Sequence, residues 1–453
     1  MLNPIQCTRQ VIHQEDGLKR KIAAAVIAAA ALTVSAACSS SSSGSGSSAS
    51  SNFMSGSTSA SGTLNVWLLS KWNNNEVPNA TAAFNKLYPN VKVNVQYQSW
   101  GTYTSKYQAA LKAGNAPDVI EMGNTDTALP IAGGAFQDLS SVKSQFPNSS
   151  SWVSSLQDSC TSASGAVDCV PYYGGDRLVA YNESEWTAAG ISSAPTSWSG
   201  LISDIQTLNT KNAGTTGFSA FYLPAGYEYL ALSMIEDAGG SLATEAGGKW
   251  TAHFNSAADV KGLENFFQLW STSKNNPSDV NDLNLSTPLT TGYTASSIYN
   301  DGLVAEPTPA PANWPTFGYF NLPSPTNAGK FVPEFLGGSD LGITAKSKNL
   351  AAADAFAAEL TSTASETAYG KEGWIPSATS LNSTLTGTTA LFAQAAAAGS
   401  WFVPNSVNWS KVDGTPNLVD ETLEAIAAAG ATPQSIQTNT TNLDNQVDAA
   451  LNS

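Results

Sequence analysis

The chain has 453 residues, 42% hydrophobic residues, only 12% charged residues and a net charge of −15. This length and hydrophobic content indicate at least two globular cores, and the negative charge makes a nucleic-acid partner unfavourable. Of the 2 His residues, His13 lies in the export segment described next, so His253 remains. The sequence therefore offers too few histidines for a histidine-rich metal site and almost none for a Ser–His–Asp triad. We expect neither a metal nor another cofactor.

The N-terminus has the pattern of an export signal. Lys19, Arg20 and Lys21 form a basic region, and Ile22–Val34 is an alanine-rich apolar run. This run is shorter than the roughly 20 apolar residues that span a bilayer, and it fits the apolar region of a signal peptide. Residues 1–17 precede the basic region, and we interpret Leu18 as the true start.

A cysteine follows the apolar run and suggests a lipid anchor. Ser35-Ala36-Ala37-Cys38 resembles a bacterial lipobox, with Ser35 in place of the usual Leu. The match predicts a signal peptide over 1–38 and lipidation of Cys38. The alternative is a secretory signal without a lipid. Residues 39–61 are nearly all Ser, Gly and Ala, and this composition predicts a flexible tether.

Strand and helix patterns alternate after the tether. We expect strands at 63–69, 91–97 and 117–121, and helices at 80–87 and 103–113. This alternation is typical of an α/β domain with a parallel sheet.

Two cysteines remain in the body, Cys160 and Cys169, and they enclose a Gly/Ser-rich loop. In an exported chain this spacing favours a disulfide over two free thiols.

Several segments together resemble a known family. In chain order they are GTLNVWLLSKW, FNKLYPNVKVNVQY, YQAALKAGNAPDVIEMGN, GGAFQDLS, CVPYYGGDRLVAYN, LGGSDLGITAKSKNLAAADAFAAELTS and GWIPSA. Their order is similar to that of the extracellular sugar-binding proteins of ABC transporters, solute-binding family 1, which includes maltose-binding protein. The resemblance covers nearly the whole body from Gly62.

The resemblance implies the two-lobed α/β fold of periplasmic binding proteins, with a hinge and a ligand cleft between the lobes. We place lobe 1 at 62–175 plus 336–376, and lobe 2 at 176–335 plus 377–453. Glycines near the two expected crossovers are candidates for hinge positions, or they are simple turns.

A sugar cleft needs flat aromatic rings and planar hydrogen-bonding groups. Residues that follow strands, or that lie on the expected crossovers, meet this requirement in the first lobe, although polar ones can also cap helices and aromatic ones can also fill the core. These candidates are Trp72, Asn124, Asp126, Tyr172, Tyr173, Asp176, Arg177, Gly338, Ser339, Asp340 and Trp374.

The second lobe offers weaker candidates, namely Glu228, Asn300, Asp301 and Trp314. The family often has a Gly-x-Trp motif near Asn300, and this chain has YNDGLVAEPTP instead.

The sequence therefore predicts a monomeric protein that binds a mono- or oligosaccharide outside the membrane and delivers it to ABC permease subunits by lobe closure. The alternatives are a tethered glycan-binding protein that serves no transporter, and a glycosidase that uses two carboxylates. We favour a protein that is not an enzyme, because neither a P-loop nor a Gly-x-Ser-x-Gly motif occurs in the sequence.

Overall fold

The computed structural model describes residues 52–69, 71, 75–274, 276, 294–295, 297–301, 312, 314–414 and 416–453. The expected signal peptide, Cys38 and Trp72 lie outside the described residues. Within the described part of the chain, none of the helices combines the length and apolar character needed to cross a membrane.

A six-stranded mixed sheet forms the centre of the first lobe, with the strand order β14-β4-β13-β3-β1-β2. The pairs β1–β2 and β1–β3 are parallel, whereas β13 runs antiparallel to both β3 and β4. The strand bounds are β1 Gly62–Leu68, β2 Val91–Tyr97, β3 Val119–Gly123, β4 Cys169–Gly175, β13 Gly337–Ile343 and β14 Ile375–Pro376.

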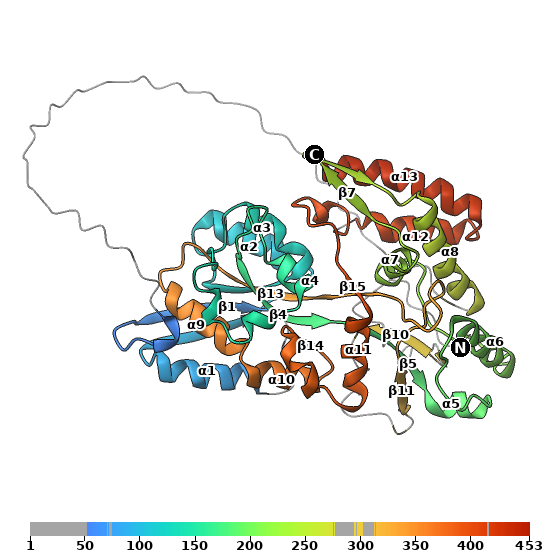
Figure 1. Cartoon of the computed structure of the whole chain (residues 1–453), viewed down its shortest axis with the longest axis horizontal. Coiled ribbons are helices and arrows are strands. Elements are labelled where there is room, and N and C mark those ends of the chain that lie inside the picture. The colour runs from blue at the N-terminus through green and yellow to red at the C-terminus, as the bar shows by residue number, and fades with distance from the viewer. Residues whose placement is uncertain are drawn as a thin grey trace, which may run out of the picture. The chain divides into compact units, whose positions relative to one another are not determined.

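Six helices accompany this sheet (Figure 1). Alanine-rich α9 buries most of its side chains, with Phe356 among them, and the Phe356 ring packs edge-on against Phe84 of α1 with 5.6 Å between ring centroids. Apolar residues of α1, α9, α10 and five of the strands form the main core of this lobe, and Tyr103 and Tyr107 of α2 pack with Ile120 and Met122 of β3 in a second cluster. The helix bounds are α1 Glu76–Leu87, α2 Tyr103–Ala113, α3 Ala128–Ala132, α4 Ser154–Ser159, α9 Leu350–Leu360 and α10 Thr363–Lys371.

The segment before β1 is part of this folded body. Phe53 is buried in the core, and its ring lies 5.0 Å from that of Phe146. Its backbone N–H donates to Gln145 Oε1 at 3.0 Å, and its carbonyl accepts from the hydroxyl of Tyr88 at 2.7 Å. The sequence assigns residues 52–61 to the tether. In the structure, the buried ring of Phe53 and the two long-range hydrogen bonds of its backbone fix this part of the Ser/Gly-rich segment.

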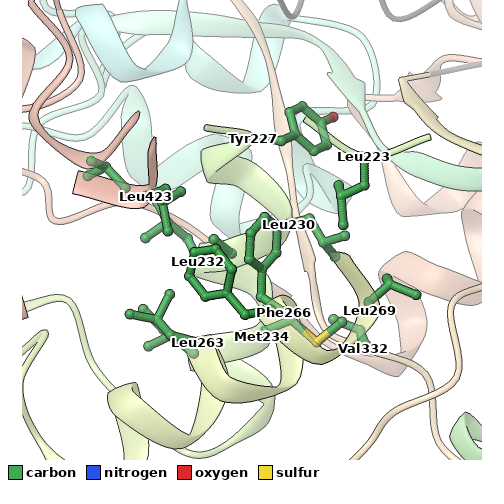
Figure 2. Close-up of a cluster of buried hydrophobic side chains, with 14 of the residues drawn as sticks. Leu223, Tyr227, Leu230, Leu232, Met234, Leu263, Phe266, Leu269, Val332 and Leu423 are labelled. Atoms are coloured by element: carbon green, nitrogen blue, oxygen red, sulfur yellow. The ribbon is translucent and has the colours of Figure 1, made fainter. Parts of the chain in front are cut away.

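Helices dominate the second lobe. Figure 2 shows side chains of its core, where Leu230 and Met234 of α7 pack among Leu263, Phe266 and Leu269 of α8. The bounds are α5 Glu183–Ala188, α6 Trp198–Lys211, α7 Glu228–Asp237, α8 Ala257–Thr272, α11 Ala390–Ala398, α12 Leu418–Ala428 and α13 Pro433–Leu451.

The strands of the second lobe are short, and they form one three-stranded sheet, β10-β5-β11, and three two-stranded pairs, β12–β15, β6–β9 and β7–β8. Their bounds are β5 Arg177–Asn182, β6 Phe218–Ser219, β7 Ala243–Ala246, β8 Lys249–Ala252, β9 Thr294–Ala295, β10 Ser297–Asp301, β11 Phe317–Phe320, β12 Glu334–Phe335 and β15 Ser400–Trp401.

The chain crosses between the lobes at two neighbouring places, described next, and again between β14 and β15. The chain leaves β4 and enters β5 with only Asp176 between them, and it leaves β12 and enters β13 with only Leu336 between them. The two crossovers lie side by side, because Gly337 pairs with Gly175 in the first sheet. Residues on both sides of these crossovers can therefore reach the space between the lobes. The division of the lobes by residue range stays a prediction.

Gly338 allows this close approach at the second crossover. Its φ of +132° lies in a region that L side chains rarely adopt, and a Cβ atom there would lie 2.1 Å from the carbonyl oxygen of Tyr173. Only glycine fits this position.

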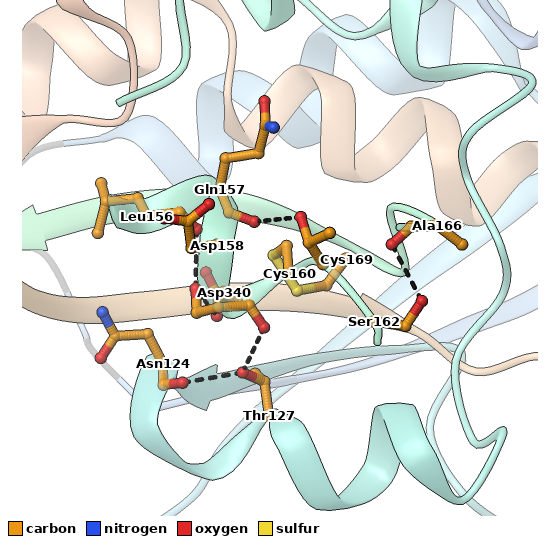
Figure 3. The surroundings of a disulfide bond; sticks show 12 residues. Asn124, Thr127, Leu156, Gln157, Asp158, Cys160, Ser162, Ala166, Cys169 and Asp340 are labelled. Carbon is orange, nitrogen blue, oxygen red and sulfur yellow. Dashed lines mark hydrogen bonds between the residues drawn. A yellow bond between two sulfur atoms is a disulfide. The ribbon is translucent and has the colours of Figure 1, made fainter. Parts of the chain in front are cut away.

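A disulfide joins Cys160, which follows α4, to Cys169 at the start of β4, with 4.8 Å between the two Cα atoms (Figure 3). Asp340 lies beside it, and the carboxylate is within 4.8 Å of both sulfur atoms. The sulfur atoms are bonded to each other, so they are not the thiolates that bind metal ions.

Candidate functional site

A cavity of about 740 Å³ lies where the two lobes meet, and we call it the cleft cavity. Its walls come from the ends of β3 and β4, from the start of α2, from both crossovers and from the segment around Asp413 that precedes α12. The lining residues are Trp100, Gly101, Tyr103, Thr104, Gly123, Asn124, Thr125, Asp126, Tyr173, Gly175, Arg177, Tyr229, Phe335, Gly337, Gly338, Trp374, Ser410, Asp413 and Gly414.

Aromatic rings from the first lobe line one part of this cavity. Trp100, which follows β2, is 39% exposed, so it offers a ring surface to a ligand. Trp374 is half-buried, and its ring packs edge-on against Tyr173 at 5.2 Å. The Tyr173 hydroxyl donates to Glu121 at 2.9 Å and accepts from Ser339 at 3.1 Å. These buried bonds fix Tyr173, and Tyr173 in turn orients Trp374.

A second aromatic group comes from the other lobe and the second crossover. The ring of Tyr229 stacks on Phe335 with 5.0 Å between centroids and 13° between planes. The guanidinium of Arg177 lies 4.2 Å from the centroid of Tyr229, and its Nε donates to the hydroxyl of Tyr227 at 2.5 Å. A stacked guanidinium held by a hydrogen bond is a preorganised planar donor.

Two carboxylates face the cavity from opposite lobes. Asp126 ends the 3₁₀ turn η2 (Asn124–Asp126), and Asp413 follows the turn η9 (Trp409–Lys411), which contacts η2. The hydroxyl of Tyr103 donates to Asp126, and burial nevertheless raises the pKa of Asp126. Burial and the charge of Asp126 together raise the pKa of Asp413 to about 7. Each carboxylate can accept hydrogen bonds from ligand hydroxyls.

The structure brings six of the residues proposed from the sequence to this cavity, namely Asn124, Asp126, Tyr173, Arg177, Gly338 and Trp374. Asn124 is almost fully buried, and its amide donates to the carbonyl of Leu336 at 3.1 Å. It therefore connects the end of β3 to the second crossover.

Four other proposed residues lie in the protein interior and do not line the cavity, because their neighbours in β4 and β13 reach it instead. Tyr172 packs edge-on against Tyr369 at 5.3 Å, Asp176 accepts from the N–H of Arg177 at 2.6 Å, and Ser339 donates to Tyr173. Asp340 accepts from Ser159 at 2.9 Å, and burial raises its pKa to about 8.

Two of the second-lobe candidates, Glu228 and Trp314, do not line the cavity. Glu228 is buried at the first position of α7, while its neighbour Tyr229 lines the cavity. Trp314 packs against Phe317 with 6.1 Å between ring centroids. The backbones of Asn300 and Asp301 pair with β5, and their side chains lie outside the described residues, as does Trp72.

Several lining residues were missed from the sequence. Trp100 carries a signal similar to that of Asn124, since it lies three residues after the end of β2, a strand of the parallel part of the sheet. Tyr229 stands out in the sequence only as part of an aromatic cluster. Phe335 and Asp413 have no local signal, because only the tertiary fold brings them to the cavity.

The two lobes, the paired crossovers and the lined cavity between them define a binding protein of the two-lobed type. The model of the bacterial extracellular solute-binding protein family matches residues 73–367. The chain belongs to this family, which confirms the family and the fold class predicted from the sequence.

Known proteins agree with this assignment. The chain is 30% identical to the diacetylchitobiose binding protein DasA of Streptomyces coelicolor over 376 residues, which cover 81% of this chain and 85% of DasA. The sugar-binding protein MalE from Xanthomonas citri has a TM-score of 0.70 at 18% identity and covers 86% of this chain and 97% of its own. The GacH receptor of Streptomyces glaucescens has a TM-score of 0.68 at 20% identity and covers 86% and 99%, respectively.

Proposed function

We propose that this protein captures a neutral oligosaccharide outside the membrane and delivers it to the permease subunits of an ABC importer. The observation that carries the proposal is the composition of the cleft cavity. The rings of Trp100 and Trp374 supply faces for sugar C–H groups, and Arg177, Asp126 and Asp413 supply donors and acceptors for hydroxyls. The similarity to DasA supports the same ligand class, and it makes N,N′-diacetylchitobiose the first compound to test.

The charges of the cavity support a neutral ligand over an acidic sugar. Asp126 and Asp413 both line it, and an additional carboxylate on the ligand would be repelled by both when they are ionised. Arg177 is already held by the ring of Tyr229 and the hydroxyl of Tyr227.

Capture would follow from lobe closure, since the lining residues come from both lobes. A ligand that contacts both lobes shifts the equilibrium towards the closed form. We further propose that the protein is monomeric and that a lipid on Cys38 tethers it to the outer face of the cytoplasmic membrane.

The glycosidase alternative would have to use the two carboxylates that face the cavity, Asp126 and Asp413. The matched family and the similar proteins are binding proteins, and this favours binding over hydrolysis. We therefore propose binding without a chemical step.

A fluorescence screen tests the proposal. Because Trp100 and Trp374 line the cavity, a bound sugar should change the tryptophan emission of the purified protein in a saturable way. The panel contains N,N′-diacetylchitobiose, maltose, maltotriose, cellobiose and glucuronic acid. We expect a response to at least one neutral oligosaccharide and none to glucuronic acid. A response to glucuronic acid alone, or to no sugar, would contradict the proposal.

A further inference from the structure

A second cavity of about 400 Å³ adjoins the cleft cavity, and we call it the side pocket. Four residues line both cavities, namely Thr104, Thr125, Asp126 and Ser410. All four have polar side chains. They form a common border, so a ligand that occupies the cleft cavity could extend past them.

One wall of the side pocket is a single face of α2. Thr104, Tyr107, Gln108 and Leu111 contribute to it, at the i, i+3 and i, i+4 spacings that place side chains on the same side of a helix. The ring of Tyr107 is fixed, because its hydroxyl bonds to Thr344 at 3.1 Å and the ring packs against Phe136 at 6.0 Å. This wall is therefore preformed.

The opposite walls come from two separate parts of the chain. Leu129 and Pro130 of α3 contribute one side, and Val407 covers the pocket from the segment before η9. That segment is anchored in the core of the second lobe through Val403 and Trp409. The side pocket, like the cleft cavity, is thus assembled from both lobes.

The side pocket contains unusually exposed apolar side chains. Leu129 is 43% exposed and Val407 is 41% exposed, and both belong to the small group of exposed large hydrophobic residues among those described. Exposed apolar side chains that meet in one pocket indicate a binding surface. Leu111 and Met122 add to the apolar surface of the pocket, which exceeds the polar surface that Gln108, Lys112, Ser406 and the border residues contribute.

We propose that the side pocket binds an apolar substituent, an alkyl or aryl aglycone, of a ligand whose sugar occupies the cleft cavity. This inference rests on the proposed function for the sugar part. The polar side chains of the border, among them Thr104, Asp126 and Ser410, can form hydrogen bonds to the sugar near its glycosidic oxygen. The apolar walls beyond the border can pack against the substituent. A longer sugar chain fits less well, because Leu111, Leu129 and Val407 offer no partners for hydroxyl groups and apolar surface predominates over that of Gln108, Lys112 and Ser406.

Two measurements on the purified protein test this inference. The first uses the uncharged apolar dye N-phenyl-1-naphthylamine, whose fluorescence rises in an apolar pocket, and needs no sugar. We expect the dye to bind, and Leu129→Asp and Val407→Asp each to weaken its binding by about tenfold. Phe331→Asp, at an exposed apolar residue outside both cavities, is the matched control and should keep the affinity.

The second measurement compares octyl and methyl N-acetyl-β-D-glucosaminide as competitors of the dye and as ligands. We expect the octyl glycoside to displace the dye and to bind about tenfold more tightly than the methyl glycoside. The ratio of the two affinities should fall towards one in Leu129→Asp and Val407→Asp and stay unchanged in Phe331→Asp.

The outcomes separate the two proposals. Absent dye binding, or dye binding that the two pocket variants leave unchanged, overturns the side pocket whatever the sugars do. Dye binding at the pocket without displacement by the octyl glycoside also overturns the inference, since the occupant is then not a sugar ligand's substituent. A silent sugar panel together with dye displacement by the octyl glycoside refutes the proposed sugar specificity and leaves the apolar site in place.

Discussion

Asp413 gives the protein a specific dependence of stability on pH. Its pKa is raised from the ordinary value of 3.8 to about 7, by burial first and by the charge of Asp126 second. Between these two values the folded chain holds a proton that the unfolded chain releases. The free energy of unfolding therefore falls as the pH rises from about 4 to about 7, and stays reduced above pH 7.

The size of this effect follows from the difference in pKa. About three pKa units correspond to roughly 4 kcal/mol, and contact with water in the cleft reduces this to about 2 kcal/mol. Asp413→Asn removes the titrating group. We expect the variant to be more stable than the parent by about 2 kcal/mol at pH 8 and by about 1 kcal/mol at pH 4.5, because the unfolded parent chain begins to release this proton near pH 3.8.

Thermal unfolding by calorimetry at pH 4.5, 6, 7 and 8 measures this difference. Asp138→Asn is a control of opposite sign. Asp138 is exposed, and hydrogen bonds from the Ser140 side chain and N–H lower its pKa. Asp138→Asn should therefore lower the free energy of unfolding at neutral pH and leave it unchanged in acid. If the parent and Asp413→Asn have parallel stability curves from pH 4.5 to pH 8, the assignment of a raised pKa to Asp413 is refuted.

Three further predictions concern the crossover, the disulfide and the cleft. Gly338→Ala should cost about 3 kcal/mol or more in denaturant unfolding, whereas Gly134→Ala, where the new Cβ meets nothing within 4 Å, should cost about 1 kcal/mol; equal costs would contradict the close packing at the crossover. Replacing Cys160 and Cys169 by Ser should lower the free energy of unfolding by about 2–3 kcal/mol, and an unchanged midpoint would mean that the disulfide does not stabilise the folded state. Tyr229→Ala should weaken sugar binding about tenfold in a fluorescence titration while Tyr229→Phe keeps it, and equal losses would assign the effect to the hydroxyl group.

The sequence predicts the first lobe well because its signals are local. The expected strand 91–97 and helix 103–113 coincide with β2 and α2. The expected strand at 117–121 appears as β3, Val119–Gly123, two residues later. Helix and strand periodicity set these elements, and tertiary packing shifts only their ends.

The cleft was only partly predictable, for two physical reasons. A strand places alternate residues on opposite faces, so naming a run such as Gly338, Ser339 and Asp340 includes residues that point into the core. In addition, Phe335 and Asp413 reach the cavity from segments far apart in the chain. No spacing rule in the sequence joins them.

The most direct test of the central claim, that a carbohydrate binds between the lobes, is a calorimetric titration of the protein with the best sugar from the fluorescence screen. Trp374→Ala removes a cleft ring, and Trp198→Ala removes a half-buried tryptophan outside the cavity. We predict one sugar bound per protein, binding weakened by about tenfold or more in Trp374→Ala, and an unchanged affinity in Trp198→Ala. Absence of binding heat, or equal affinities for the parent and Trp374→Ala, would contradict the account.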